Sequence, residues 1–85
     1  MSEPLVNIER IKADILALAE IGRHERDRGI YRMAFTDADM EAKRWLLNRI
    51  EENGLTPASD GAANISGVLE GHVDSPRFYV GSHID

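Results

Sequence analysis

Apolar residues recur at helical intervals near the start of the chain. Between residues 5 and 22 they follow one another every three or four positions, as one stripe of a 3.6-residue period: Leu5, Ile8, Ile11, Ile15 and Leu18. Asn7 is placed to cap the start of this segment, and Gly22 to end it in a left-handed conformation. The spacing predicts an amphipathic helix over residues 5–22, with no chemistry visible on it.

A second helix is predicted over residues 37–53. Thr36 and Asp39 have the spacing of a capping box, and Asn53-Gly54 is a typical C-terminal cap. One face of this helix carries a set of apolar residues: Met40, Leu46, Leu47 and Ile50. The segment between the two helices lacks a period and is predicted to be a loop.

After Gly54 the pattern changes to the alternation typical of strands. Three short strands are predicted, over residues 55–58, 64–70 and 77–83. Asp60-Gly61 is a turn signal, and Gly67 indicates a bulge or the close approach of another backbone. The second and third strands are predicted to form an antiparallel hairpin. The fold class is therefore predicted as α/β, with two helices packed on one face of a small mixed or antiparallel sheet.

Composition narrows the class of protein. The chain has 85 residues, 42% of them hydrophobic, a net charge of -5 and no cysteine. These values are typical of one small folded domain without disulfides or thiolate zinc sites. An acidic chain without a basic stripe predicts no nucleic-acid partner. Its longest apolar run, Ile15–Ala19, is too short to span a membrane, and no signal peptide is recognisable, so we expect a cytoplasmic protein.

The strongest candidate for chemistry is the sequence Gly81-Ser-His-Ile-Asp85. It follows an apolar strand, where α/β proteins often place functional side chains. Alternate residues of a strand point to the same side, so His83 and Asp85 are expected to face together. A carboxylate that accepts one ring N–H leaves the other imidazole nitrogen free to bind a metal.

Three other residues are weaker candidates. His72 forms a second His-x-Asp pair with Asp74, but its turn-like setting favours solvent exposure. His24 begins a mixed-sign charged run, for which a solvated loop is the favoured interpretation. Arg32 is either a clamp for a substrate carboxylate or part of a structural salt bridge, and the salt bridge is favoured.

Four segments in order carry a resemblance to a known family. They are Gly29-Ile-Tyr-Arg-Met-Ala-Phe-Thr36, then Asp39 with Ala42-Lys43 and Gly54-Leu55, then Asp60-Gly-Ala-Ala-Asn-Ile-Ser-Gly67, and Gly81-Ser-His-Ile-Asp85. The chain thereby resembles, along nearly its whole length, the N-terminal part of the dinuclear-metal amidohydrolases of the M20 peptidase clan. It is most similar to the branch of N-carbamoyl-amino-acid hydrolases, β-ureidopropionases and allantoate amidohydrolases. Ala63 departs from the glycine usual there, and Arg49 from an apolar or aromatic residue.

The resemblance implies a function and roles for two residues. His83 matches the first metal-ligating histidine, and Asp85 the carboxylate that orients this histidine without binding metal. The full-length family uses two divalent ions, zinc or manganese, to hydrolyse an N-carbamoyl amino acid or a ureido acid such as allantoate, and we expect it to be a homodimer. The 85 residues are expected to be the opening portion of a larger zinc-peptidase-like catalytic domain, inactive and without tight metal binding alone.

Two alternatives stay open at this point. One is a non-catalytic interaction or assembly module that retains the family's N-terminal segment. The other is an aminoacylase or dipeptidase specificity within the same clan, which these residues do not distinguish from ureido-acid hydrolysis.

Overall fold

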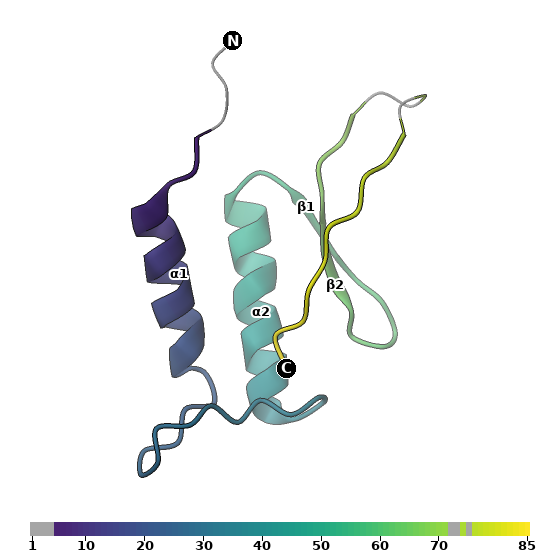
Figure 1. Ribbon diagram of the computed structural model, residues 1–85. Coiled ribbons are helices and arrows are strands. Elements are labelled where there is room, and N and C mark those ends of the chain that lie inside the picture. Colours follow the sequence, from purple (N-terminus) through teal and green to yellow (C-terminus); the bar gives the residue numbers. More distant parts are fainter. Residues whose placement is uncertain (1–4, 72–73, 75) are drawn as a thin grey trace.

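The computed structural model describes residues 5–71, 74 and 76–85. Two helices, α1 (Ile8–Glu20) and α2 (Asp37–Glu52), precede two strands, β1 (Thr56–Ser59) and β2 (Ile65–Val68). The helices lie side by side and run antiparallel, and the strands lie against α2 (Figure 1). The predicted fold class, a small α/β arrangement with an antiparallel sheet, is confirmed, although only α2 makes extensive contacts with the strands.

Local capping explains where the helices begin and end. The side-chain oxygen of Asn7 accepts a hydrogen bond from the backbone N–H of Arg10 at 3.0 Å, as predicted for the cap of α1. Gly22 and Gly54 follow the C-caps of the two helices with φ angles of 83° and 78°. Glycine adopts this left-handed conformation without a steric penalty, which is why both helices stop there.

The hairpin forms between β1 and β2, and the two-stranded sheet leaves out residues 76–85, so the predicted pairing of residues 64–70 with 77–83 is wrong. Asp60 shapes the turn of the hairpin, because its carboxylate accepts hydrogen bonds from the backbone N–H groups of Ala62 and Asn64, each at 2.9 Å. This turn folds β2 back onto β1, with Thr56 opposite Val68 and Ser59 opposite Ile65. Residues 76–85 contain no strand, because extended backbone becomes a strand only beside a hydrogen-bonded neighbour.

Close approach between α2 and β2 occurs at Gly67. A Cβ atom added there would lie 2.8 Å from Cγ2 of Ile50, so only glycine fits this position without a shift. Gly67 was predicted to mark a bulge or the close approach of another backbone, and the structure instead places a helix side chain against it. This contact fixes the distance between the helix and the sheet.

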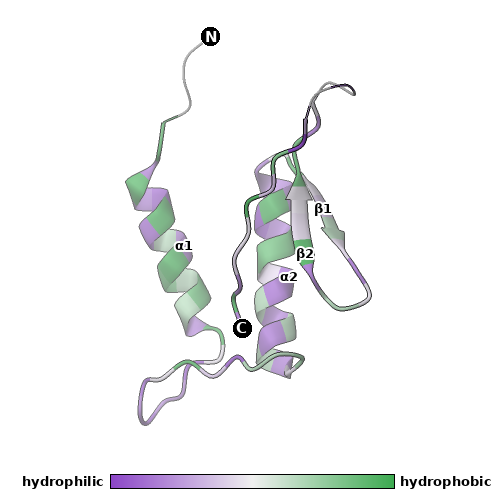
Figure 2. Ribbon diagram, turned by 45° about the vertical axis from the view of Figure 1, so that its right-hand side comes forward, coloured by the Kyte–Doolittle hydropathy of each residue, from purple (hydrophilic) through white to green (hydrophobic). Residues whose placement is uncertain are grey.

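Little of the apolar surface is buried within the described residues. Ala42 is the one apolar residue among them that is fully buried, whereas Ile15 of α1 is 62% exposed and Leu16 is 66% exposed. Apolar and polar residues are interspersed along both helices (Figure 2). In the described part of the chain, neither helix is long and apolar enough to cross a membrane.

Two polar contacts between side chains join α1 to α2. Arg49, which departs from the apolar residue of the resembled branch, places Nη2 3.0 Å from Oδ1 of Asp14. One turn away along both helices, Arg10 donates a hydrogen bond to the side chain of Asn53. Polar contacts therefore hold the two helices together where apolar burial is small.

The turn between β1 and β2 contains strain that a substitution can remove. Ala63 has a φ angle of 62°, a conformation that costs a residue with a Cβ about 1–2 kcal/mol. We expect Ala63→Gly to raise the free energy of unfolding by about 0.5–1 kcal/mol, after the greater flexibility of unfolded glycine is subtracted. Urea denaturation followed by circular dichroism measures this change.

Ala62→Gly is the matched control, because Ala62 is in the same turn and has no positive φ angle. It should lower the free energy of unfolding by about 0.5–1 kcal/mol. If both substitutions destabilise the protein equally, the left-handed conformation of Ala63 is contradicted.

Candidate functional site

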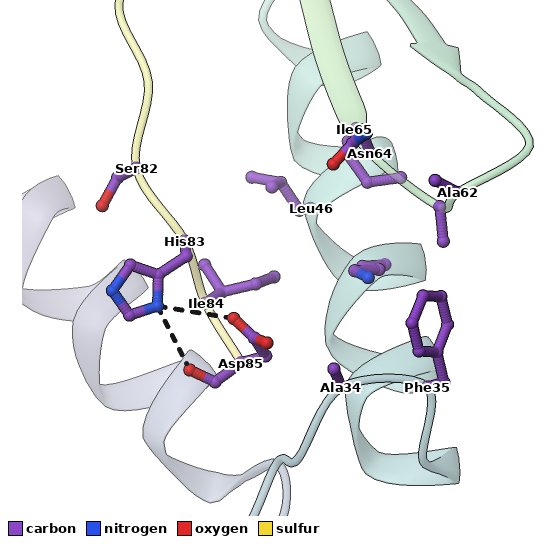
Figure 3. A pocket seen from close by; sticks show the side chains of 12 residues that line it. Ala34, Phe35, Leu46, Ala62, Asn64, Ile65, Ser82, His83, Ile84 and Asp85 are labelled. Carbon is purple, nitrogen blue, oxygen red and sulfur yellow. Dashed lines mark hydrogen bonds and ion pairs between the residues drawn. The ribbon is translucent and has the colours of Figure 1, made fainter.

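A cavity of about 350 Å³ lies between α2, the turn before β2 and the C-terminal segment. Its lining comes from residues 34–35, from Lys43 and Leu46 of α2, from residues 62–65 and from residues 82–85. In Figure 3 the side chains of Ile84 and Asp85 point toward α2, whereas those of Ser82 and His83 point to the other side of the C-terminal segment. The resembled segments 29–36, 60–67 and 81–85 thus all contribute to one cavity.

His83 and Asp85 lie together at this cavity. Nδ1 of His83 is 3.4 Å from Oδ1 of Asp85 and 3.3 Å from the Asp85 backbone oxygen (Figure 3). A hydrogen on Nδ1 can be shared with these oxygens, which leaves Nε2 free. The His83 side chain is 83% exposed, so Nε2 is open to a ligand. The expected proximity of the two side chains is confirmed, and their roles toward a metal stay a prediction.

The described residues do not make a metal centre by themselves. No group of three or more histidine, cysteine, aspartate or glutamate side chains is gathered closely enough in the described part of the chain. A catalytic zinc ion usually has about three protein ligands, and His83 with Asp85 supplies one imidazole and one orienting carboxylate. This pair therefore needs further ligands before it can hold such an ion.

Arg32 differs from both of its sequence-based interpretations. Its Nη1 donates hydrogen bonds to the backbone oxygens of Leu18 at 2.7 Å and Ile21 at 2.9 Å. Its Nε donates to the backbone oxygen of Ile84 at 3.0 Å. The favoured salt bridge is wrong for these nitrogens, because their partners are uncharged carbonyl groups. Free carbonyls at the end of a helix carry partial negative charge and therefore attract a cation.

The other two histidines are placed differently. His24 lies in an exposed loop, where its Nδ1 accepts a hydrogen bond from the backbone N–H of Arg26 at 3.3 Å and its ring meets Tyr31 edge-on. This setting agrees with the predicted loop. His72 lies outside the described residues.

The pair formed by Asp39 and Lys43 was not predicted from the sequence. Asp39 is fully buried, and its Oδ2 accepts hydrogen bonds from Nζ of Lys43 at 2.9 Å and from the backbone N–H of Phe35 at 2.9 Å. Nζ of Lys43 also lies 5.6 Å from the centre of the Phe35 ring. The spacing of four residues on a helix was the signal that could have found this pair.

Asp39 is held in its charged form. The hydrogen bond from Lys43 and then that from the Phe35 N–H lower the pKa of its carboxyl group, against the opposing effect of burial. Thr36 adds the predicted cap, because its hydroxyl accepts the Asp39 N–H at 3.3 Å. The carboxylate, however, binds the residue before Thr36, one position earlier than in a standard capping box. Asp39 therefore joins the start of α2 to the loop that lines the cavity.

Asp39→Asn tests how much the Asp39–Lys43 pair contributes to the free energy of unfolding. The substitution leaves the Lys43 ammonium without its counter-charge, so we expect the free energy of unfolding to fall at neutral pH by clearly more than in the control below. The folded-state pKa of Asp39 lies below the ordinary value of 3.8, so its stabilisation is complete above that value and is lost as pH falls through the folded-state pKa. The loss of stability as pH falls below 3.8 should therefore be smaller in the variant.

Asp37→Asn is the matched control, since Asp37 is an exposed carboxylate in the first turn of the same helix. It loses only the interaction with the helix dipole, about 0.3–1 kcal/mol. Equal effects of the two substitutions in urea denaturation at pH 7 would contradict the account of Asp39.

Two curated proteins are similar to the chain along almost its whole length. N-carbamoyl-L-amino-acid amidohydrolase of Pseudomonas sp. (strain NS671) is 36% identical over 86 residues, which is 100% of the chain. N-carbamoyl-L-amino acid amidohydrolase of Geobacillus stearothermophilus is 32% identical over 82 residues, or 95% of the chain. No family model and no solved structure matches the chain.

The chain spans only 20% of the length of each of these relatives. The similarity supports the resemblance to the N-carbamoyl-amino-acid branch, whereas the wider M20 clan stays a prediction. The chain is thus similar, over 95–100% of its length, to about one fifth of each of these two proteins.

Proposed function

We propose that this chain is part of a hydrolase that cleaves the carbamoyl group from an N-carbamoyl-L-amino acid. The observation that carries the proposal is the similarity of the whole chain to two proteins of that name, one of them 36% identical. The cavity supports it, because the segments of the resemblance meet there with the His83–Asp85 pair exposed to solvent. Water attack on the carbamoyl carbon would release the amino acid, ammonia and carbon dioxide.

The roles of the chain's own residues follow from their contacts. Asp85 faces Nδ1 of His83, which leaves Nε2 open to solvent beside the cavity. The Asp39–Lys43 pair fixes the loop at residues 34–35 that forms another wall. The resemblance adds further parts to the proposal: His83 as a metal ligand, a zinc or manganese pair, a homodimer and membership of the M20 clan. A cytoplasmic location is proposed separately, from the sequence features given above. Further metal ligands would come from other parts of the complete protein.

Substrate specificity is the sharpest test of this proposal. The product of the complete open reading frame that contains this chain is assayed with N-carbamoyl-L-alanine, allantoate, N-acetyl-L-alanine and a dipeptide. We expect the release of ammonia and alanine from N-carbamoyl-L-alanine to have the highest kcat/KM. The 85-residue chain alone should release none, because its described residues do not complete a metal centre.

Each other outcome contradicts the proposal. A higher kcat/KM for N-acetyl-L-alanine or the dipeptide identifies an aminoacylase or a dipeptidase. A higher kcat/KM for allantoate identifies a ureido-acid hydrolase of different specificity. Absence of turnover with all four substrates and with added zinc or manganese favours a non-catalytic module.

Substitution of His83 tests whether this cavity is the active site. In the complete protein, His83→Ala should lower kcat/KM for the carbamoyl substrate at least about 100-fold, and Asp85→Asn about 10–100-fold. His24→Ala is the control and should leave kcat/KM unchanged, because His24 lies in an exposed loop away from the cavity. Equal activity of the His83 and His24 variants would place the active site elsewhere.

A further inference from the structure

We propose that Arg32 is a positioning residue that holds the His83–Asp85 pair in place from the loop between the helices. Its Nε binds the backbone oxygen of Ile84, which lies between the two members of the pair. Its Nη1 binds the backbone oxygens of Leu18 and Ile21 at the end of α1. The Arg32 guanidinium thus binds both the end of α1 and Ile84, which lies 52 residues further along the sequence.

The anchoring matters because the C-terminal segment has little other support. Residues 76–85 lie outside the sheet, and Phe78, Tyr79 and Val80 are at least 86% exposed. Among the described residues, the bond from Arg32 to Ile84 is the one hydrogen bond that joins this segment to the rest of the chain. In Figure 1 the segment runs down beside α2 and ends near the loop that carries Arg32. Fixing the Ile84 carbonyl therefore restricts the backbone on both sides of it.

Only arginine suits this position. The planar guanidinium directs its N–H groups along fixed lines, so Nε and Nη1 can bind different carbonyls at once. Lysine has a single ammonium on a flexible chain and cannot reproduce this fork. Because Nε and Nη1 are both engaged by the backbone, the geometry opposes the alternative in which they clamp a substrate carboxylate.

Gly22 makes room for the arginine. A Cβ atom at Gly22 would lie 2.8 Å from Cγ of Arg32 and 2.6 Å from the backbone oxygen of Tyr31. The backbone N–H of Tyr31 also donates to the Gly22 oxygen at 2.8 Å. The end of α1 and the arginine are therefore packed in direct contact, and the side chain has a defined path.

The expected effect of Arg32 on catalysis rests on the proposed function, whereas the hydrogen bond from Arg32 to Ile84 does not. If a misplaced His83 lies about 1 Å from its working position, catalysis can fall about 100-fold while the substrate still binds. Arg32→Lys in the complete protein should therefore lower kcat about 100-fold with little change in KM. Loss of a substrate clamp would instead raise KM.

The experiment has one arm that does not depend on turnover. In the isotope-labelled protein, Arg32→Lys should increase the fast backbone mobility of His83 and Ile84, measured by the heteronuclear NOE of their amides. Arg26→Lys is the matched control, because Arg26 lies in the exposed loop after α1 and does not line the cavity. It should change neither mobility nor kcat.

A measurement on the unsubstituted protein covers the case in which the variant does not fold. Through-hydrogen-bond scalar coupling between Nε of Arg32 and the carbonyl carbon of Ile84 should be detectable. Its absence, unchanged mobility in Arg32→Lys, or an effect confined to KM overturns the proposal. If the unsubstituted protein hydrolyses no carbamoyl substrate, the proposed function fails, and the coupling and mobility still decide the anchoring.

Discussion

The hydrogen bonds from Arg32 to three backbone carbonyls are the interaction on which the arrangement of this chain depends most. They join the end of α1, the loop between the helices and the segment that carries His83 and Asp85. No strand pairing holds that segment among the described residues. Without this guanidinium, His83 and Asp85 would still contact each other, but no hydrogen bond would fix their position relative to the cavity.

Polar contacts, more than apolar burial, hold the elements of this chain together. Asp39 is the largest fully buried side chain among the described residues, and its partners are an ammonium and a backbone N–H. A core this small leaves little stability from apolar burial, so the contacts of the buried Asp39 Oδ2 contribute a larger share. The exposed apolar faces of α1 and of residues 78–80 agree with the proposal that the chain belongs to a longer protein.

The local parts of the structure could be predicted from the sequence, because their causes are local. The helical period, the Asn7 cap and the glycines at both helix ends predicted α1 and α2 closely. The strand pairing could not be predicted, since alternation does not say which neighbour a strand has. The hydrogen bonds that Asp60 accepts in the turn bring β2 back onto β1, and residues 76–85 pair with neither strand.

The local contact within the candidate site could be predicted from the sequence, but its contacts with distant residues could not. Spacing alone indicated that His83 and Asp85 face together, and the structure brings them within 3.4 Å. The contact between Arg32 and Ile84 spans 52 residues and leaves no periodic signal, so the sequence suggested a carboxylate partner instead. The pair of Asp39 and Lys43 had a visible helical spacing, but burial of that pair depends on the surrounding loop.

The most direct test of the central claim is a high-resolution crystal structure of the product of the complete open reading frame. We expect Nε of Arg32 to bind the Ile84 carbonyl and Nη1 to bind the carbonyls of Leu18 and Ile21, with Nδ1 of His83 facing Asp85. A structure in which the Arg32 guanidinium binds a carboxylate, and the Ile84 carbonyl binds another partner, would contradict it.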